Sequence, residues 1–224
     1  MPTFEYTLRR NLREIRRSFR AQQRQALVLV KPSVAATPEV YRCPWCLRDP
    51  VYVHYHDNEW GRLCTDDLKL FEFLVLETSQ AGLSWLTVLK KRENYRALFA
   101  GFDPVKVADF TQADVDRMVL DPGIVRSRRK INAAINNAQV FLGIKREYDR
   151  FADYIFTFLP ERRPIVNNPA RVIEIPANTP YSDALAADLR KRGMQFIGST
   201  ICYAHLQAAG FVNDHLVKCS FKHA

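Results

Sequence analysis

The sequence predicts an all-α protein, and three observations carry this prediction. Apolar residues recur at helical spacing through most of the chain, and helix-start signals stand in front of these segments. Alternation of polar and apolar residues, the pattern of a strand with one buried face, is nearly absent. A chain of 224 residues is long enough to build one substantial core from such helices.

The N-terminal segment, residues 7–25, predicts a basic amphipathic helix. Its apolar stripe has helical spacing among arginines and consists of Leu8, Leu12, Ile15 and Phe19. We expect this segment to pack on the body as a helix or loose arm. Alternatively, it would bind DNA or an anionic membrane, or it would serve as an Arg-rich transit peptide. Residues 31–40, with two prolines and no periodicity, indicate a linker. The chain divides into this basic extension with its linker, 1–40, and a body, 41–224, expected to be one compact two-lobed unit.

The net charge of +9 is concentrated near the N-terminus. Residues 1–31 hold eight Lys or Arg and two Glu, so +6 lies there and +3 on the rest of the chain. A nucleic-acid interface on the body must therefore be a local patch. No apolar run approaches the ~20 residues of a membrane span. Five cysteines without a signal peptide are expected to be free thiols or metal ligands, and we expect a cytoplasmic monomer.

The first half of the body predicts a series of helices. Residues 66–80 have an apolar face at helical spacing and acids at the start, where the helix dipole favours them. The string AGLS interrupts the pattern, and Ser84 can cap a helix over 85–99. Asp103, followed by proline, predicts the start of the next helix. Thr111, with an acid three residues later, resembles a capping box.

The second half of the body predicts a tight turn, a long helix and a less regular stretch. The turn is the DPG string at 121–123, and the helix follows over 124–142. Residues 149–180 contain five prolines, which indicate loops and short helices. The last two predicted helices run from Ser182 to Gly193 and over 198–209.

The turn at residues 121–123 has the features of a helix–hairpin–helix, which we place at about 111–143. Gly123 would let the backbone approach a partner closely, and the amides at the start of the next helix would bind a phosphate. The basic residues that would add charge are Arg126, Arg128, Arg129 and Lys130. An αα-hairpin with a solvated basic face explains this pattern equally well.

Cysteine and histidine pairs at opposite ends of the body predict a zinc site. His215 and Cys219 are four residues apart, one helical turn, so both side chains would project from one face of a helix. Cys43 and His56 stand near the start of the body, and two Cys with two His complete a tetrahedral zinc set. Such a site would close a long loop of the chain and constrain the unfolded state.

Spacing alone leaves the ligand set open. Cys43 and Cys46 form a CxxC motif, and His54 neighbours His56. A set of Cys43, Cys46 and His56 with one C-terminal residue is therefore a competitor. We expect the two remaining histidines, His205 and His223, to be hydrogen-bonded helpers rather than ligands.

Several stretches from Arg42 to Cys219 together resemble 3-methyladenine DNA glycosylase I of the constitutive bacterial type. They are RCPWC, DPVYVHYHDNEWG, LFEFLVLETSQAGLSWLTVLKKRENYR, FDPVKVA, GIVRSRRKINAAINNA and GSTICYAHLQAAGFVNDHLVKC. The resemblance implies an all-helical glycosylase of the helix–hairpin–helix superfamily whose terminal regions are joined by a structural zinc ion. Matching positions place the zinc ligands at Cys43, His56, His215 and Cys219. Cys46 and His54 depart from the family pattern, as does the N-terminal extension.

The substrate class implied by the resemblance is N3-alkylated adenine in double-stranded DNA. Matching positions assign Glu77 as the pocket acid and catalytic residue, Trp85 as the stacking tryptophan and Tyr55 as the pocket tyrosine. Trp45 and Trp60 are expected to be further pocket walls. Apart from the resemblance, Glu77 is typical of a surface helix and Trp85 of a core.

The same resemblance suggests how these parts would act. Leu83, at the tip of AGLS, is a candidate wedge into the base stack. His56 would bind the metal while Tyr55 contacts the base, so that the metal would hold in place the loop that contributes Tyr55 to the pocket. The region after the hairpin has Asn where many superfamily members have a catalytic aspartate, and Asp149 lies too far along the chain. We therefore expect Glu77 or the backbone to hold the attacking water, with an abasic site as product.

A binding protein remains the alternative. A zinc-containing helix–hairpin–helix chain would also suit a non-catalytic module that recognises damaged DNA, although the intact set of Tyr55, Glu77 and Trp85 favours an enzyme. A membrane-surface or organelle-targeted protein is supported only by residues 1–31.

Overall fold

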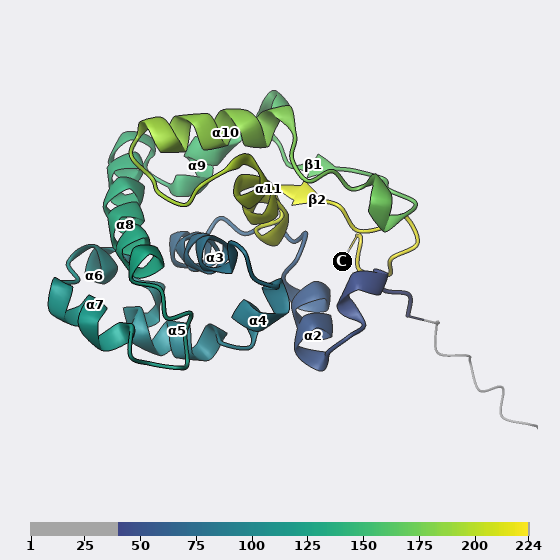
Figure 1. Ribbon diagram of the computed structural model, residues 1–224. Helices are drawn as coiled ribbons and strands as arrows, with labels where there is room; N and C mark the ends of the chain where they lie inside the picture. The colour runs from purple at the N-terminus through teal and green to yellow at the C-terminus, as the bar shows by residue number, and fades with distance from the viewer. Residues whose placement is uncertain (1–39, 224) are drawn as a thin grey trace, which may run out of the picture. The chain divides into compact units, whose positions relative to one another are not determined.

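The computed structural model describes residues 40–223, and it is mostly helical, as predicted (Figure 1). The expected basic helix over 7–25 lies outside the described residues. The helices are α2 (Pro50–Asn58), α3 (Asp67–Gln80), α4 (Trp85–Leu89), α5 (Arg92–Leu98), α6 (Pro104–Ala108), α7 (Gln112–Met118), α8 (Arg128–Tyr148), α9 (Phe151–Phe156), α10 (Pro180–Lys191) and α11 (Ser199–Ala208). Short 3-10 turns are η1 (Pro44–Cys46), η2 (Ala100–Phe102), η3 (Pro160–Arg162) and η4 (Val172–Glu174). No helix in this part of the chain is long and apolar enough to cross a membrane.

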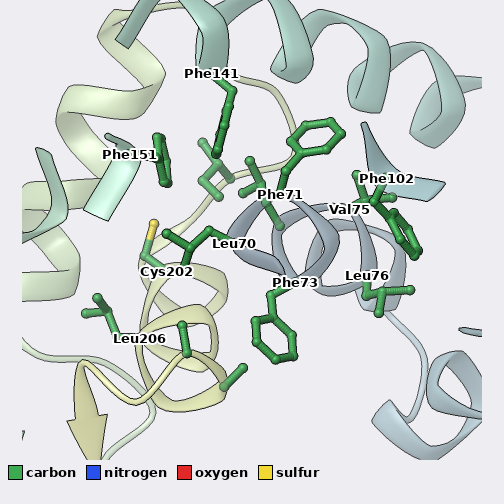
Figure 2. Packing of buried hydrophobic residues seen from close by; sticks show 14 of the residues in the cluster. Leu70, Phe71, Phe73, Val75, Leu76, Phe102, Phe141, Phe151, Cys202 and Leu206 are labelled. Atoms are coloured by element: carbon green, nitrogen blue, oxygen red, sulfur yellow. The ribbon is translucent and has the colours of Figure 1, made fainter. Parts of the chain in front are cut away.

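Helix α3 forms the centre of the core. Its residues 70–79 are all buried, because the FEFLVLE segment is apolar on nearly every side and packs against α4, α8, α9 and α11. Figure 2 shows Phe71 of α3 close to Phe141 of α8, and these rings have centroids 5.3 Å apart. Asp66 caps the helix by accepting a hydrogen bond from the Lys69 amide, so the predicted helix over 66–80 is confirmed.

The region predicted as one helix over 85–99 forms two helices, α4 and α5. Ser84 caps α4 as expected, but α4 ends at Leu89 and α5 begins at Arg92. Lys91 stands at the break, and its ammonium donates to the Pro122 carbonyl. The break therefore lies where the chain contacts the hairpin turn.

The next two helix starts are confirmed. Asp103 caps α6 with Pro104 at its first position, and Thr111 and Asp114 form both hydrogen bonds of a capping box at the start of α7.

Helix α8 differs from its predicted range of 124–142. It begins four residues later, at Arg128, and continues to Tyr148. The residues in between belong to the turn, where Ile124 is buried and the Val125 amide donates to the Tyr95 hydroxyl. An aliphatic pair that would continue a helical pattern is used to fasten the turn instead.

The stretch over 149–180 consists of short helices, turns and strand β1 (Ile165–Val166), as expected from its prolines. Helix α10 begins before the predicted Ser182, because Thr179 is its cap and Pro180 its first residue. Ser182 is the third helical residue and completes the capping box.

The end of the chain is not helical, contrary to the expectation for His215 and Cys219. After strand β2 (Val212–Asn213), which pairs in parallel with β1, the chain continues in turns. Figure 1 shows this terminal segment beside the start of the described chain. Tyr41 and Ser220 join the two ends, since the Ser220 amide donates to the Tyr41 carbonyl at 2.9 Å.

Candidate active site and metal centre

A pocket of about 320 Å³ opens between helices α2, α3, α4 and α11. Helix α11 lies far from the other three in the sequence, and the short turns η1 and η4 also contribute lining residues. The lining residues are Trp45, Tyr52, Tyr55, Trp60, Glu77, Gln80, Trp85, Val172, Ile175, Ala204 and Gln207. All five residues predicted for the base pocket therefore lie together.

Glu77 is the acidic side chain of this pocket. It comes from the C-terminal part of α3 and is only 4% exposed. Its carboxylate accepts no hydrogen bond within residues 40–223, and burial raises the pKa of Glu77 to about 8. A buried carboxyl group without a protein partner, facing a pocket, is suited to bind a cation or a hydrogen-bond donor.

Aromatic rings form the walls around Glu77. Tyr55 is buried, and its ring centroid lies 5.5 Å from that of Trp85. Trp45 and Trp60 contact each other edge to face, with centroids 4.8 Å apart. Burial, and then the Glu77 charge, raise the pKa of Tyr55 well above its ordinary value, so its hydroxyl is neutral and can donate.

The pocket also contains polar residues that the sequence analysis did not identify. Tyr52 lies one turn before Tyr55 on α2, so its spacing provided a signal. Gln80 and Gln207 provided none, because nothing local marks a helical glutamine as a pocket residue. The Trp85 indole N–H is buried and has no partner in the described part of the chain, so it is an available donor.

Tyr55 and His56, expected on a loop, belong to helix α2, and this helix connects the pocket to a second cluster. Tyr55 faces the pocket, whereas the next residue, His56, faces Cys43, His215 and Cys219. One ligand atom from each of these four residues lies within 4.8 Å of all the others, and all four side chains are buried.

The four-residue cluster has the geometry of a metal centre. Cys219 Sγ lies 3.3 Å from His215 Nδ1 and 3.5 Å from His56 Nε2, and Cys43 Sγ lies 3.8 Å from His215 Nδ1. A tetrahedral ion about 2.0–2.3 Å from nitrogen and sulfur ligands separates them by about 3.3–3.8 Å. Burial raises the pKa of the Cys43 thiol to about 12, so a cation would be needed to stabilise the thiolate.

The outer contacts of the two histidines orient them for this role. His56 Nδ1 lies 2.8 Å from an Asp57 carboxylate oxygen, which leaves Nε2 to face the cluster. His215 Nε2 lies 2.9 Å from the Trp60 carbonyl oxygen, which leaves Nδ1. At Gly61, with φ of 74°, an added Cβ would lie 2.9 Å from the His215 ring. Glycine is therefore needed where the chain passes the cluster.

The two competing ligands are outside the cluster. The Cys46 thiol donates to the Cys43 carbonyl, and His54 contacts Asn58 on the surface of α2. His205 also departs from expectation, because it is buried and neither ring nitrogen has a hydrogen-bond partner within the described residues.

Comparison with known proteins places this architecture in a family. The family model described as methyladenine glycosylase matches residues 45–223. DNA-3-methyladenine glycosylase 1 of Escherichia coli is 53% identical over 80% of this chain and 95% of its own length. The chain belongs to the methyladenine glycosylase family.

Other relatives agree with this assignment. The DNA-3-methyladenine glycosylase of Haemophilus influenzae is 45% identical over 81% of this chain and 97% of its own length. Among solved structures, a crystal structure of 3-methyladenine DNA glycosylase I has a TM-score of 0.77 at 50% identity, covering 80% of this chain and 98% of its own. A Tyr-to-Phe variant of such an enzyme in complex with 3-methyladenine has a TM-score of 0.78 at 36% identity, covering 82% and 98%.

In this glycosylase the segment predicted as a helix–hairpin–helix, about 111–143, contributes no residue to the pocket lining. The close approach made by Gly123 is internal, because a Cβ there would lie 2.8 Å from the Asn94 side chain. Arg126 is exposed, and Arg128 forms an ion pair with Asp116. Lys130 donates to the Ser79 and Ala81 carbonyls, so it fastens the end of α3 to α8.

On the inner side of α8, where an acid would have been a candidate catalytic residue, the glycosylase has asparagine. Asn137 is buried and bonds to both the amide and the carbonyl of Gln195, and Asn136 donates to the Gly193 carbonyl. These side chains hold the segment before α11 in place. Asp149 lies beyond the end of α8 with φ of 68°. Glu77 is consequently the acid that the pocket itself provides.

Proposed function

We propose that the chain is a DNA repair glycosylase that flips N3-methyladenine out of double-stranded DNA and hydrolyses its N-glycosidic bond, leaving an abasic site. The observation that carries this proposal is the carboxyl group of Glu77, which is buried in a pocket walled by aromatic rings and has no hydrogen-bond partner within residues 40–223. Its relatives are named for this lesion, and one was solved with 3-methyladenine bound.

Charge is the property by which the pocket would select its base. Methylation at N3 makes the adenine of a nucleotide cationic, and the aromatic faces of Tyr55 and Trp85 suit a flat cation. Glu77, with its raised pKa, would ionise on contact with that cation and pair with it. Neutral adenine would leave the acid protonated or its charge uncompensated, so the undamaged base would be rejected.

The chemical step would depend on the weakened bond of the alkylated base. Cleavage passes the electron pair of the C1′–N9 bond to the base, which leaves as a neutral molecule because it began as a cation. The hydroxyl of water adds to C1′, and the remaining proton passes to solvent or to Glu77. The residues of α8 that approach the core are asparagines engaged with the backbone, which supports water held by Glu77 or by main-chain groups.

The wedge and the hairpin would hold the DNA. Leu83 is 40% exposed and stands on the turn between α3 and α4. Gln80 and Trp85, the residues on either side of this turn, line the pocket. Leu83 would fill the space that the flipped base leaves. Backbone amides after Gly123, with Arg126 and Arg128, would bind phosphates. Lys130 would act indirectly, by fixing the turn that carries Leu83.

We further propose that Cys43, His56, His215 and Cys219 hold a structural zinc ion. Two thiolates and two imidazoles are a set that zinc prefers, and four protein ligands leave no open position for substrate. When bound, the ion supplies a cross-link between the two ends of the body. Because Tyr55 and His56 are neighbours on α2, this cross-link would hold one wall of the pocket.

The experiment is a base-release assay on methylated double-stranded DNA, with chromatography of the free bases. The proposal expects 3-methyladenine among the products of the purified chain, and release by the Glu77→Gln variant that is slower by roughly one to two decades at matched enzyme concentration. DNA binding without release would instead support the non-catalytic module.

A further inference from the structure

Gln207 is a polar residue of the pocket wall. It stands on α11, half-buried, and lines the same pocket as Glu77 of α3. Its side-chain amide donates to Asp214 Oδ2 at 2.7 Å. No donor within residues 40–223 reaches its Oε1.

Asp214 holds that amide in one orientation. This carboxylate is 1% exposed and also accepts from the Tyr203 hydroxyl at 2.6 Å and from the Asn167 amide at 2.7 Å. An ionised carboxylate accepts hydrogen bonds and donates none. The NH₂ group of Gln207 must therefore face Asp214, and its carbonyl oxygen is left for the pocket.

We propose that Gln207 is a specificity-determining residue whose Oε1 accepts a hydrogen bond from the exocyclic amine of the bound base. Asp214 is the positioning residue that keeps this oxygen, and not the amide NH₂ group, directed at the ligand. A purine with a carbonyl oxygen at the same position would bring two acceptors together and be rejected. The inference rests on the proposed function and assigns to the pocket a second criterion besides charge.

The two criteria are carried by separate groups. Glu77 on α3 responds to the charge of the base, whereas Gln207 on α11 distinguishes an exocyclic amine from an exocyclic carbonyl oxygen on the six-membered ring. The network behind Gln207 joins α11 to the terminal segment, since Asp214 directly precedes His215 of the metal cluster. The same segment that closes the metal site would thus set the hydrogen-bonding character of one pocket wall.

The test compares two free bases, 3-methyladenine and 3-methylhypoxanthine, which differ in the amine and the oxygen at that position. Calorimetric dissociation constants are measured for wild type, Gln207→Met and Asp214→Asn. Gln207→Met keeps the length of the side chain but offers no amide oxygen. We expect its preference for the amine-bearing base to fall by roughly five- to tenfold, the value of one neutral hydrogen bond. Asp214→Asn should lower the preference in the same direction with unchanged metal content.

Tyr203→Phe is the matched control. It removes a different hydrogen bond to Asp214 and leaves the Gln207 contact, so the preference should stay at the wild-type value. A merely structural role for Gln207 would weaken both bases by the same factor, and that result would overturn the inference. A wild-type chain that binds and releases no 3-methyladenine would instead overturn the proposed function.

Discussion

Glu77 makes ligand binding depend on pH in a way that the structure specifies. Burial raises the pKa of this carboxyl group from 4.5 to about 8 in the free protein, so at pH 7 it is mostly protonated. A base that carries a fixed positive charge must bind the ionised form. Binding of such a base therefore competes with a proton, and its affinity should rise with pH until the pH passes the pKa of Glu77.

The size of the effect follows from that pKa. The fraction of Glu77 that is ionised rises from about 1% at pH 6 to about one half at pH 8, if the pKa is about 8. The dissociation constant of a permanently cationic base should accordingly fall roughly fifty-fold between these two pH values. Tyr55 does not contribute, because its pKa is shifted further upward.

The assay is a titration with 3,9-dimethyladeninium, which carries a fixed charge and resembles the methylated nucleoside. Neutral 9-methyladenine is the matched ligand, since it shares any effect of pH on the protein but not the charge pairing. Glu77→Gln should lose the fifty-fold dependence for the cation. A flat profile in the wild type, or the same slope in the variant, would refute the assignment of Glu77 as the group that reads charge.

Three further predictions concern the metal, the core and the N-terminal extension. Metal analysis should find one zinc per chain that Cys219→Ser loses and Cys46→Ser keeps, and loss in the latter would show that the ligand set is wrong. Burial lowers the pKa of His205 from 6.5 to about 4, so the folded state resists a proton that the unfolded state accepts. Between pH 7.5 and pH 5 the free energy of unfolding, measured in urea, should therefore fall by about 2 kcal/mol more in the wild type than in His205→Phe. Parallel pH profiles of the two proteins would contradict this. Deletion of residues 1–36 should keep activity but flatten the salt dependence of DNA binding, because it removes cationic phosphate contacts; an unchanged slope would exclude contact by this segment.

The parts of the fold that the sequence predicted are those with local causes. Caps such as Asp66 and Thr111, and the apolar segment around Phe71, act within a few residues of themselves. Helix α2 was not predicted, because its inner face carries residues of the pocket and of the Cys/His cluster, such as Tyr55 and His56, instead of an aliphatic stripe. The late start of α8 has a distant cause, the contact of the turn with α5 through Tyr95.

The residues of the candidate site likewise fall into those that the sequence identified and those that depend on distant contacts. Glu77, Trp85 and Tyr55 were identified through the resemblance, and the structure brings them into one pocket. Gln207 and its partner Asp214 were not, since their pairing exists only after α11 and the terminal segment have folded against each other. His215 and Cys219 reach the cluster with Cys43 and His56 through turns, because a set of metal ligands needs convergent side chains and not a helix.

The most direct test of the central claim is single-turnover release from a duplex with one N3-methyladenine. Free base and abasic strand should appear in equal amounts with wild type, and the rate with Glu77→Gln should fall by roughly one to two decades, the value of a hydrogen bond to a charged group. Glu93→Gln is the matched control, because Glu93 is a largely exposed acid of α5 and not part of the pocket wall. A Glu77→Gln variant that releases the base at the wild-type rate would contradict the account.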